Sequence, residues 1–141
     1  MSERSMQVIV PVYRALPALQ RLVAGLRRTL DAGERVLFCD DASPEAEVSA
    51  YLRSLPGTLP FETRVVRRER NLGFVGNVNA AFAETGEDDV VLLNSDTVPS
   101  AGWLNRLRAC FAADRRIATA TPWANNAEIC SLPHLCRPGP L

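Results

Sequence analysis

Short apolar runs alternate with helix-type repeats along most of the chain, and this alternation restricts the fold more than any other feature. Runs of strand length occupy residues 7–13, 35–39, 61–66, 89–94 and 116–121. Helix-type spacing of apolar residues covers about 16–30, 44–55, 73–86 and 100–113. Alternating strands and helices are typical of α/β domains, in which right-handed crossovers build a largely parallel sheet with helices on both faces. We therefore expect an α/β fold with five strands.

Two of the expected helices carry specific signals. Ser43 followed by Pro44 is a good N-cap and first-turn pair for the second helix. In the third helix the apolar spacing predicts residues that face the sheet, namely Phe74, Val78, Ala81 and Phe82. Periodicity stops after Thr121, so residues 122–141 are expected to form an irregular tail.

The formal net charge is zero, and all sixteen basic residues are arginines. A neutral chain offers no basic face for nucleic acid. The lack of lysine excludes both a P-loop and Schiff-base catalysis, and with the many alanines it favours a GC-rich bacterial coding sequence. No apolar run approaches the ~20 residues of a membrane span. No secretory signal precedes the first strand, so we expect the protein in the cytoplasm.

The four cysteines form no CxxC pair. Cys39 and Cys110 fall within apolar-periodic segments, where a buried free thiol is the usual state. Cys130, His134 and Cys136 could share a metal ion, but their spacing matches no zinc pattern and a fourth ligand is missing. Structural thiols are therefore favoured.

Polar and aromatic side chains follow the predicted strands at the edge where a parallel sheet binds ligands. They are Tyr13, Asp40, Asp41, the arginine-rich loop at 67–71 and the cluster at 94–96. Ligands of open α/β sheets lie outside the carboxyl ends of the strands. The first strand is followed by neither a glycine-rich phosphate loop nor a lysine. A diphosphate at this edge would therefore need a divalent cation, which Asp96 could hold together with phosphate oxygens and water.

Four motifs stand in order at these strand ends and helix starts: "VIVPVYRA", "CDDAS", "RNLGFVGNVNAAF" and "LLNSDTVPSAGWL". In order and approximate spacing they resemble the motifs of family 2 glycosyltransferases with the GT-A fold, over essentially the whole chain. The resemblance implies a Rossmann-like GT-A fold of which this chain is the donor-binding half. It places a nucleotide-sugar-binding domain at 1–121 and a tail at 122–141 that leads towards an acceptor-binding half.

The resemblance also implies how the base of a nucleotide is bound. Tyr13 would lie against the base, framed by the backbone around Pro11; the alternative is a ring packed under its own loop. Asp41 would accept a hydrogen bond from the N3–H of uracil or thymine, whereas Asp40 would support the turn. The alternative for both aspartates is capping of a helix N-terminus.

The remaining site residues are assigned by the resemblance to the donor and its metal. Gly73 would allow a tight entry into a helix whose N-terminus faces the donor, and Asn71 matches a position that is usually polar. The stretch 94–96 matches the D-x-D element of the family, with Ser95 in the nucleotide site and Asp96 as ligand of manganese or magnesium. Ser95 stands where many relatives carry an aspartate, so metal binding would rest on Asp96 alone among side chains.

The implied activity is inverting transfer of a sugar to an acceptor hydroxyl in the biosynthesis of cell-surface polysaccharide. The donor is expected to be UDP- or dTDP-linked, and the acceptor a saccharide or a lipid-linked molecule. The catalytic base is expected beyond Leu141, so the 141 residues alone are expected to be inactive. The full-length protein is expected in the cytoplasm or at the periphery of the inner membrane. Apolar tail residues are expected to fold over the open flank of the sheet or to drive self-association.

Two other interpretations stay open. One is a non-catalytic nucleotide-sugar-binding module, or a remnant, that acts with a partner chain. The other is a nucleotidyltransferase, which is disfavoured because the Gly-rich, Lys-containing first loop of that class is absent.

Overall fold

A computed structural model describes residues 6–114 and 116–125 of the chain. The chain divides into two compact units, Met1–Ala101 and Gly102–Leu141. Within the described residues, the first unit contains four strands and three helices, and a fourth helix belongs to the second unit. The domain boundary that the sequence predicts after Thr121 stays a prediction.

The strands form one parallel sheet in the order β3-β2-β1-β4. They are β1 (Met6–Val12), β2 (Arg35–Asp40), β3 (Glu62–Arg67) and β4 (Asp89–Leu92). The sequence predicts each of them to within a residue or two at either end. The strand β1 is buried along its whole length, because β2 and β4 flank it and helices cover both of its faces. The predicted α/β fold is confirmed.

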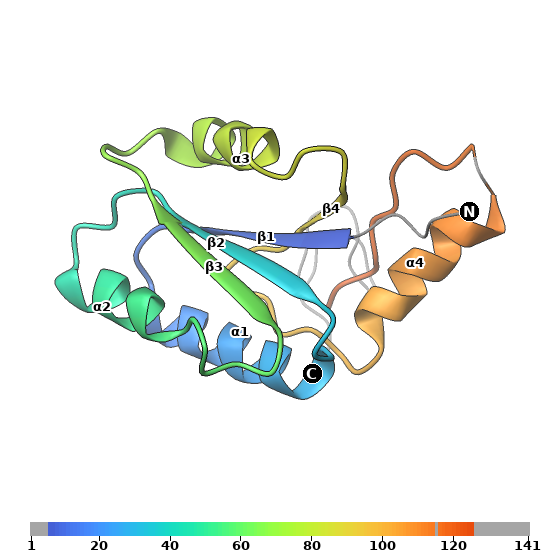
Figure 1. Ribbon diagram of the computed structural model, residues 1–141, viewed down its shortest axis with the longest axis horizontal. Coiled ribbons are helices and arrows are strands. Elements are labelled where there is room, and N and C mark those ends of the chain that lie inside the picture. The colour runs from blue at the N-terminus through green and yellow to red at the C-terminus, as the bar shows by residue number, and fades with distance from the viewer. Residues whose placement is uncertain (1–5, 115, 126–141) are drawn as a thin grey trace. The chain divides into compact units, whose positions relative to one another are not determined.

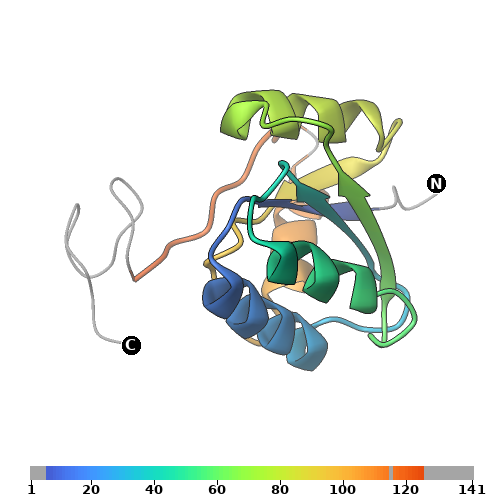
Figure 2. The same ribbon diagram turned by 90° about the vertical axis from the view of Figure 1, so that its left-hand side faces the viewer.

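Three helices cover the sheet. Helices α1 (Leu16–Thr29) and α2 (Ala46–Ser54) lie on one face, and α3 (Gly73–Ala83) lies on the other (Figures 1 and 2). The apolar spacing of α1 predicts the burial of Leu19, Val23 and Leu26, which is observed, and Leu22 is buried beside them. The helix α4 (Trp103–Ala113) belongs to the second unit and buries Leu104 and Leu107. None of the helices in the described part of the chain is long and apolar enough to cross a bilayer.

The face of the sheet that carries α3 is packed with compact apolar side chains. Ile9, Leu37 and Cys39 form a buried cluster with Ala81 of α3. Burial raises the pKa of Cys39 to about 11, so its thiol stays protonated near neutral pH. The predicted buried thiol is confirmed at this position.

The inward face of α3 differs from the prediction. Val78 and Ala81 are buried as expected, but Phe74 and Phe82 are 56% and 43% exposed, so their prediction as core residues is wrong. Asn77 occupies an inward position and is 1% exposed. Apolar spacing alone misses such a residue, because buried amides are uncommon and depend on partners distant in the sequence.

Hydrogen bonds account for the burial of Asn77. Its Nδ2 donates to the backbone oxygen of Cys39 in β2 at 2.8 Å, and its Oδ1 accepts from Arg68 Nε at 2.9 Å. Arg68 in turn pairs with Glu84 just after α3, with 2.6 Å between Nη1 and Oε1. Asn77 therefore ties the middle of α3 to the sheet.

The start of α2 also differs from the prediction. The helix begins at Ala46 with Glu45 in the N-cap position, so the prediction of Ser43 and Pro44 as its first residues is wrong. The backbone N–H of Ser43 instead donates to Asp40 Oδ1 at 2.9 Å. Ser43 thus belongs to the loop that Asp40 organises, which leaves the helix to start later.

Two predictions in the second unit are wrong. Residues 116–121 form turn and irregular backbone rather than a fifth strand, and the N–H of Ile117 donates to the backbone oxygen of Asp114 at 3.1 Å. Ile117 is exposed; a β-type alternation makes a strand only where neighbours bury one of its faces. Cys110 is exposed rather than buried. The three residues considered for a metal near the C-terminus, and most of the predicted tail, lie outside the described residues.

The Asn77 contacts lead to a stability prediction. Asn77→Ala removes the hydrogen bond to the Cys39 carbonyl and leaves Arg68 Nε without the acceptor Asn77 Oδ1, which should lower the free energy of unfolding by about 1–3 kcal/mol. Urea unfolding followed by circular dichroism measures the change. Asn79→Ala is the matched control, because Asn79 is exposed on the same helix and should change stability by less than ~0.5 kcal/mol. Equal losses in the two variants would contradict this role of Asn77.

Candidate functional site

The strand order creates a point where the chain reverses its direction across the sheet. From β1 the chain proceeds through β2 to β3, and α3 then leads back to β4 on the other side of β1. In open α/β sheets, ligands bind outside the carboxyl ends of the strands at such a switch point. Here these are the ends of β1 and β4. The loops after β1 and β2 and the start of α3 lie at this edge, which faces the viewer in Figure 2.

Pro11 explains why β1 and β4 separate at this edge. The β4 ladder ends where Ile9 pairs with Leu92 and the N–H of Leu93 donates to the Ile9 oxygen at 2.9 Å. Because backbone groups of a parallel strand alternate between its two neighbours, the missing N–H of Pro11 faces the β4 side. Val12 instead accepts from Asp41 N–H on the β2 side at 2.8 Å. The central strand β1 tolerates a proline at this position because β4 no longer pairs with it there.

Tyr13 follows β1 in a turn of unusual backbone conformation. Arg14 and Ala15 have φ of 63° and 56°, in the left-handed region that costs residues with a Cβ about 1–2 kcal/mol each. The guanidinium carbon of Arg14 lies 5.2 Å from the centroid of the Tyr13 ring. Tyr13 is 45% exposed; its nucleotide role stays a prediction.

Asp41 lies beside this turn, since Val12 and Asp40 are register partners. Its side chain is 3% exposed, and Oδ1 accepts from the backbone N–H of Leu72 at 2.8 Å, just before α3. This is the helix-capping contact considered as an alternative for Asp41. Within the described residues no hydrogen bond reaches Oδ2, so the carboxylate keeps one oxygen for a further donor.

Asp40 is the buried support of the β2 loop. Its Oδ1 accepts from Ser43 N–H, and its Oδ2 accepts from Ser49 Oγ at 2.9 Å and from Arg67 Nη1. Burial by itself raises the pKa of Asp40, but the hydrogen bonds from Ser43, Ser49 and Arg67 outweigh it and hold the pKa below its ordinary value. The expectation that Asp40 supports the turn is confirmed.

Asn71 and Gly73 form the entry to α3. Asn71 Nδ2 donates to the backbone oxygen of Asp41 at 3.3 Å, and its Oδ1 accepts from Gly73 N–H at 3.0 Å. Gly73 has φ of 72°, which a side chain would strain. The amide of Asn71 therefore joins the Asp41 loop to the first turn of α3. That turn is exposed at the carboxyl edge, where its free N–H groups can meet an anion.

A tight turn carries Ser95 and Asp96 after β4. The N–H of Thr97 donates to the backbone oxygen of Asn94 at 3.1 Å, and Asp96 is exposed whereas Ser95 is half-buried. Further along, Pro99 lies against Gly25 of α1, where an added Cβ would meet Pro99 Cδ at 3.2 Å. This contact fixes the outgoing end of the loop that carries Asp96.

The donor set at this edge fits a divalent cation shared with a ligand. The described part of the chain holds no cluster of three or more His, Cys, Asp or Glu side chains that could bind a metal. An exposed carboxylate such as Asp96 suits a cation that takes its other oxygens from phosphate and water. Metal binding by this chain would then depend on the presence of the ligand.

Several residues that organise the edge were missed or left open in the sequence analysis. Ser43 and Ser49 donate hydrogen bonds to Asp40. The guanidinium group of Arg67 donates to Asp40, and that of Arg68 donates to Asn77. Their partners lie up to 27 residues away. Spacing within one element gives no signal of such contacts.

The parallel sheet with its switch-point edge defines a Rossmann-like domain, and the comparisons with known proteins identify its family. The model of glycosyl transferase family 2 matches residues 7–130, and the chain belongs to this family. It is 30% identical over 122 residues to the pre-mycofactocin glycosyltransferase of two Mycobacterium tuberculosis strains, CDC 1551 / Oshkosh and H37Rv. The match covers 86% of this chain and 24% of each relative, so the chain spans about a quarter of their length.

Solved structures share the fold. S. aureus TarS 1-349 in complex with UDP matches with a TM-score of 0.63 and 21% identity, over 79% of this chain and 33% of that one. GalNAc-T7 with UDP, GalNAc and Mn²⁺ matches with a TM-score of 0.58 and 17% identity, over 79% of this chain and 22% of that one. The predicted family and the predicted Rossmann-like GT-A fold are both confirmed.

The depressed pKa of Asp40 leads to a prediction about pH. A carboxyl whose pKa is lowered by folding stabilises the protein above its ordinary pKa, and this contribution is lost as the pH falls through the ordinary and then the folded value. Asp40→Asn should therefore cost about 1–3 kcal/mol at pH 7, and the difference from wild type should shrink in acid.

Urea unfolding between pH 7 and pH 3 measures this dependence. Arg67 is 43% exposed, so solvent weakens its part of the interaction. Glu47→Gln, which changes an exposed carboxylate on α2, is the control and should leave the pH profile unchanged. A constant difference between Asp40→Asn and wild type at all pH values would contradict the assignment.

Proposed function

We propose that this chain is the donor-binding part of a glycosyltransferase that transfers a sugar from a nucleotide diphosphate to an acceptor hydroxyl with inversion. The observation that carries the proposal is the separation of β1 and β4 at Pro11, because it opens the switch-point edge between the Tyr13 turn and the Asp96 turn. An aromatic ring, a carboxylate with one uncommitted oxygen and an exposed aspartate border that edge. Membership in the family and the UDP in a structural neighbour support the same activity.

The base of the nucleotide is bound by the loops after β1 and β2. The exposed face of Tyr13 stacks on the base, framed by the backbone at Pro11. Asp41 accepts the N3–H of uracil or thymine through Oδ2, since Oδ1 is held by Leu72 N–H. This chemistry favours UDP- or dTDP-linked sugars over cytidine or adenine donors.

The diphosphate is bound between the start of α3 and the turn after β4. Asn71 and Gly73 place the positive end of the α3 dipole towards the phosphates. Asp96 holds a divalent cation, manganese or magnesium, together with phosphate oxygens, and Ser95 adds a hydroxyl on the nucleotide side. The cation supplies compensation for the negative charge that develops on the leaving diphosphate. The Mn²⁺ in one structural neighbour supports this assignment.

The finer features of the activity follow from the same proposal. The acceptor is a saccharide or lipid-linked hydroxyl that serves cell-surface polysaccharide, and a carboxylate base outside these 141 residues deprotonates it. Residues 1–121 form the donor domain and 122–141 lead towards the acceptor part or self-associate. The protein works in the cytoplasm, at the periphery of the inner membrane.

A non-catalytic nucleotide-sugar-binding module that acts with a partner chain is the second candidate, because the proposed donor site lies wholly within this chain.

The role of Asp96 can be tested by removing its charge. Asp96→Asn should abolish the increase in UDP affinity that manganese gives to the wild type, because the cation loses its protein carboxylate. Calorimetric titration of UDP with and without manganese measures this. Asp31→Asn changes an exposed aspartate in the loop before β2, at the opposite edge, and should leave the increase intact. A full manganese effect in Asp96→Asn would exclude Asp96 as the ligand.

The role of Asp41 can be tested with the same type of substitution. Asp41→Asn keeps an oxygen for Leu72 N–H but replaces the other oxygen by an NH₂ group, which cannot accept from uracil. UDP binding should weaken by about 1–3 kcal/mol. Binding of CDP, whose N3 accepts a hydrogen bond, should improve relative to UDP. An unchanged ratio of UDP to CDP affinity would show that Asp41 does not read the base.

A further inference from the structure

One side-chain oxygen holds the turn after β1 in its unusual conformation. The backbone N–H of Arg14 donates to Ser43 Oγ at 2.9 Å, across 29 positions of the sequence. Arg14 and Ala15 both adopt left-handed φ values, which are unfavourable for residues with a Cβ and persist only where surrounding contacts enforce them. The Ser43 hydroxyl is such a contact.

Ser43 is itself held firmly in place. It is 1% exposed, its N–H donates to Asp40 Oδ1 at 2.9 Å, and its backbone oxygen accepts from Arg67 Nη2 at 3.0 Å. Because the backbone N–H and C=O of Ser43 are both hydrogen-bonded, its hydroxyl oxygen is held in one position. The Arg14 amide must adopt the conformation that reaches this acceptor. Ser49 donates to the same Asp40 carboxylate from α2, but among the described residues its hydroxyl makes no hydrogen bond to the turn.

The two loops joined in this way carry the residues proposed to bind the base. Tyr13 directly precedes Arg14, and Asp41 lies two positions before Ser43. We propose that Ser43 is a positioning residue of the donor site, which sets the location of the Tyr13 ring relative to the Asp41 carboxylate through its hydrogen bond to the Arg14 amide. This inference rests on the proposed function. Ser43 acts on the base only through Tyr13 and makes no contact with the nucleotide.

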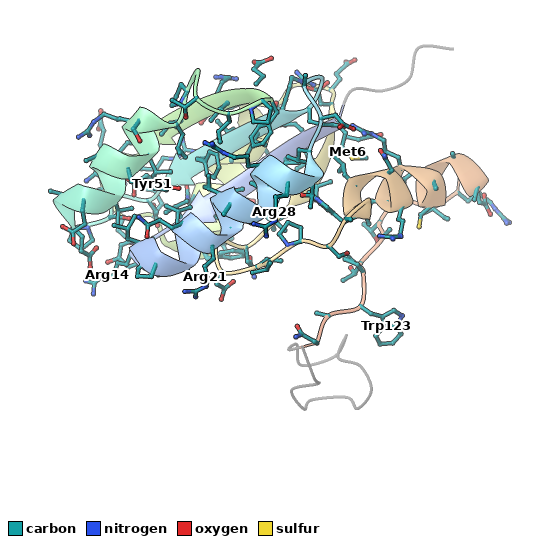
Figure 3. The ribbon with its side chains drawn as sticks, turned by 90° about the horizontal axis from the view of Figure 1, so that it is seen from below. Met6, Arg14, Arg21, Arg28, Tyr51 and Trp123 are labelled. Atoms are coloured by element: carbon teal, nitrogen blue, oxygen red, sulfur yellow. The ribbon has the colours of Figure 1, made fainter. Side chains whose placement is uncertain are left out.

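The effect on Tyr13 can be observed without any ligand. The chain contains two tyrosines: Tyr13 lies in the turn after β1, next to Arg14, and Tyr51 lies on α2 (Figure 3). In protein labelled with ¹³C-tyrosine, Ser43→Ala should move the Tyr13 ring signals towards those of free tyrosine and leave Tyr51 unchanged. An unmoved Tyr13 signal overturns the inference.

Ser49→Ala is the matched control for this measurement. It removes one hydroxyl from the same Asp40 carboxylate and should lower stability to a similar degree. Because the Ser49 hydroxyl makes no hydrogen bond to the described residues of the turn, the Tyr13 signals should stay in place. Equal movement of Tyr13 in both variants would mean that general loosening of the Asp40 network moves the ring, and it would overturn the specific role of Ser43.

The effect on the base is measured with two probes, UDP and inorganic pyrophosphate, each with manganese. Ser43→Ala should weaken UDP binding roughly two- to tenfold, as expected for the loss of one neutral hydrogen bond, and leave pyrophosphate binding unchanged. Equal weakening of both probes, or of neither, overturns the inference. If the wild-type protein binds pyrophosphate but not UDP, the proposed nucleotide function fails and the inference fails with it, even where the Tyr13 signal moves.

A milder substitution keeps the test decisive if Ser43→Ala does not fold. Ser43→Cys retains the approximate size of the side chain and replaces the oxygen by a weakly accepting sulfur. Ser43→Cys should also lower UDP affinity, by a smaller factor than Ser43→Ala. It should displace the Tyr13 signal in the same direction. A Ser43→Cys protein with wild-type UDP affinity and an unmoved Tyr13 signal overturns the inference.

Discussion

The buried carboxylate of Asp40 is the interaction on which the rest of the proposed ligand-binding edge depends. It stands at the end of β2 and accepts hydrogen bonds from a loop, from α2 and from the last residue of β3. Burying a charge is costly unless donors surround it, and here their hydrogen bonds more than offset the cost, since the pKa stays below its ordinary value. Three segments that are separate in sequence are thereby held in one geometry.

A second constraint acts on the other side of β1. Pro11 cannot donate to a neighbouring strand, so pairing with β4 stops before it and the two strands part. The resulting edge has a rigid side, built on Asp40, and a side formed by the turn that carries Asp96. A supported loop and an accessible carboxylate are what the proposed site requires, in which the nucleotide would complete the metal coordination.

The aspartates of this edge show why neighbouring residues of one type take different roles. Asp40 points into the domain and is satisfied by protein donors, whereas Asp41 uses one oxygen to hold the start of α3 and keeps the other uncommitted. Asp96 is exposed on a turn. The support of the scaffold by Asp40 and the proposed roles of Asp41 and Asp96 therefore differ in how many hydrogen bonds each carboxylate makes to its own protein.

Local sequence pattern determined the four strands, the buried stripe of α1 and the edge at which the polar residues gather, because strand and helix periodicities are properties of neighbouring residues. The order of the motifs was sufficient to identify the family. Tertiary structure alone decided that Asn77 rather than Phe74 faces the sheet and that 116–121 form no strand. It also decided that Ser43 serves a loop instead of a helix cap, because its partners Asp40, Arg14 and Arg67 come from three different segments. Burial and long-range hydrogen bonds depend on which elements meet, and a periodic pattern within one element does not contain that information.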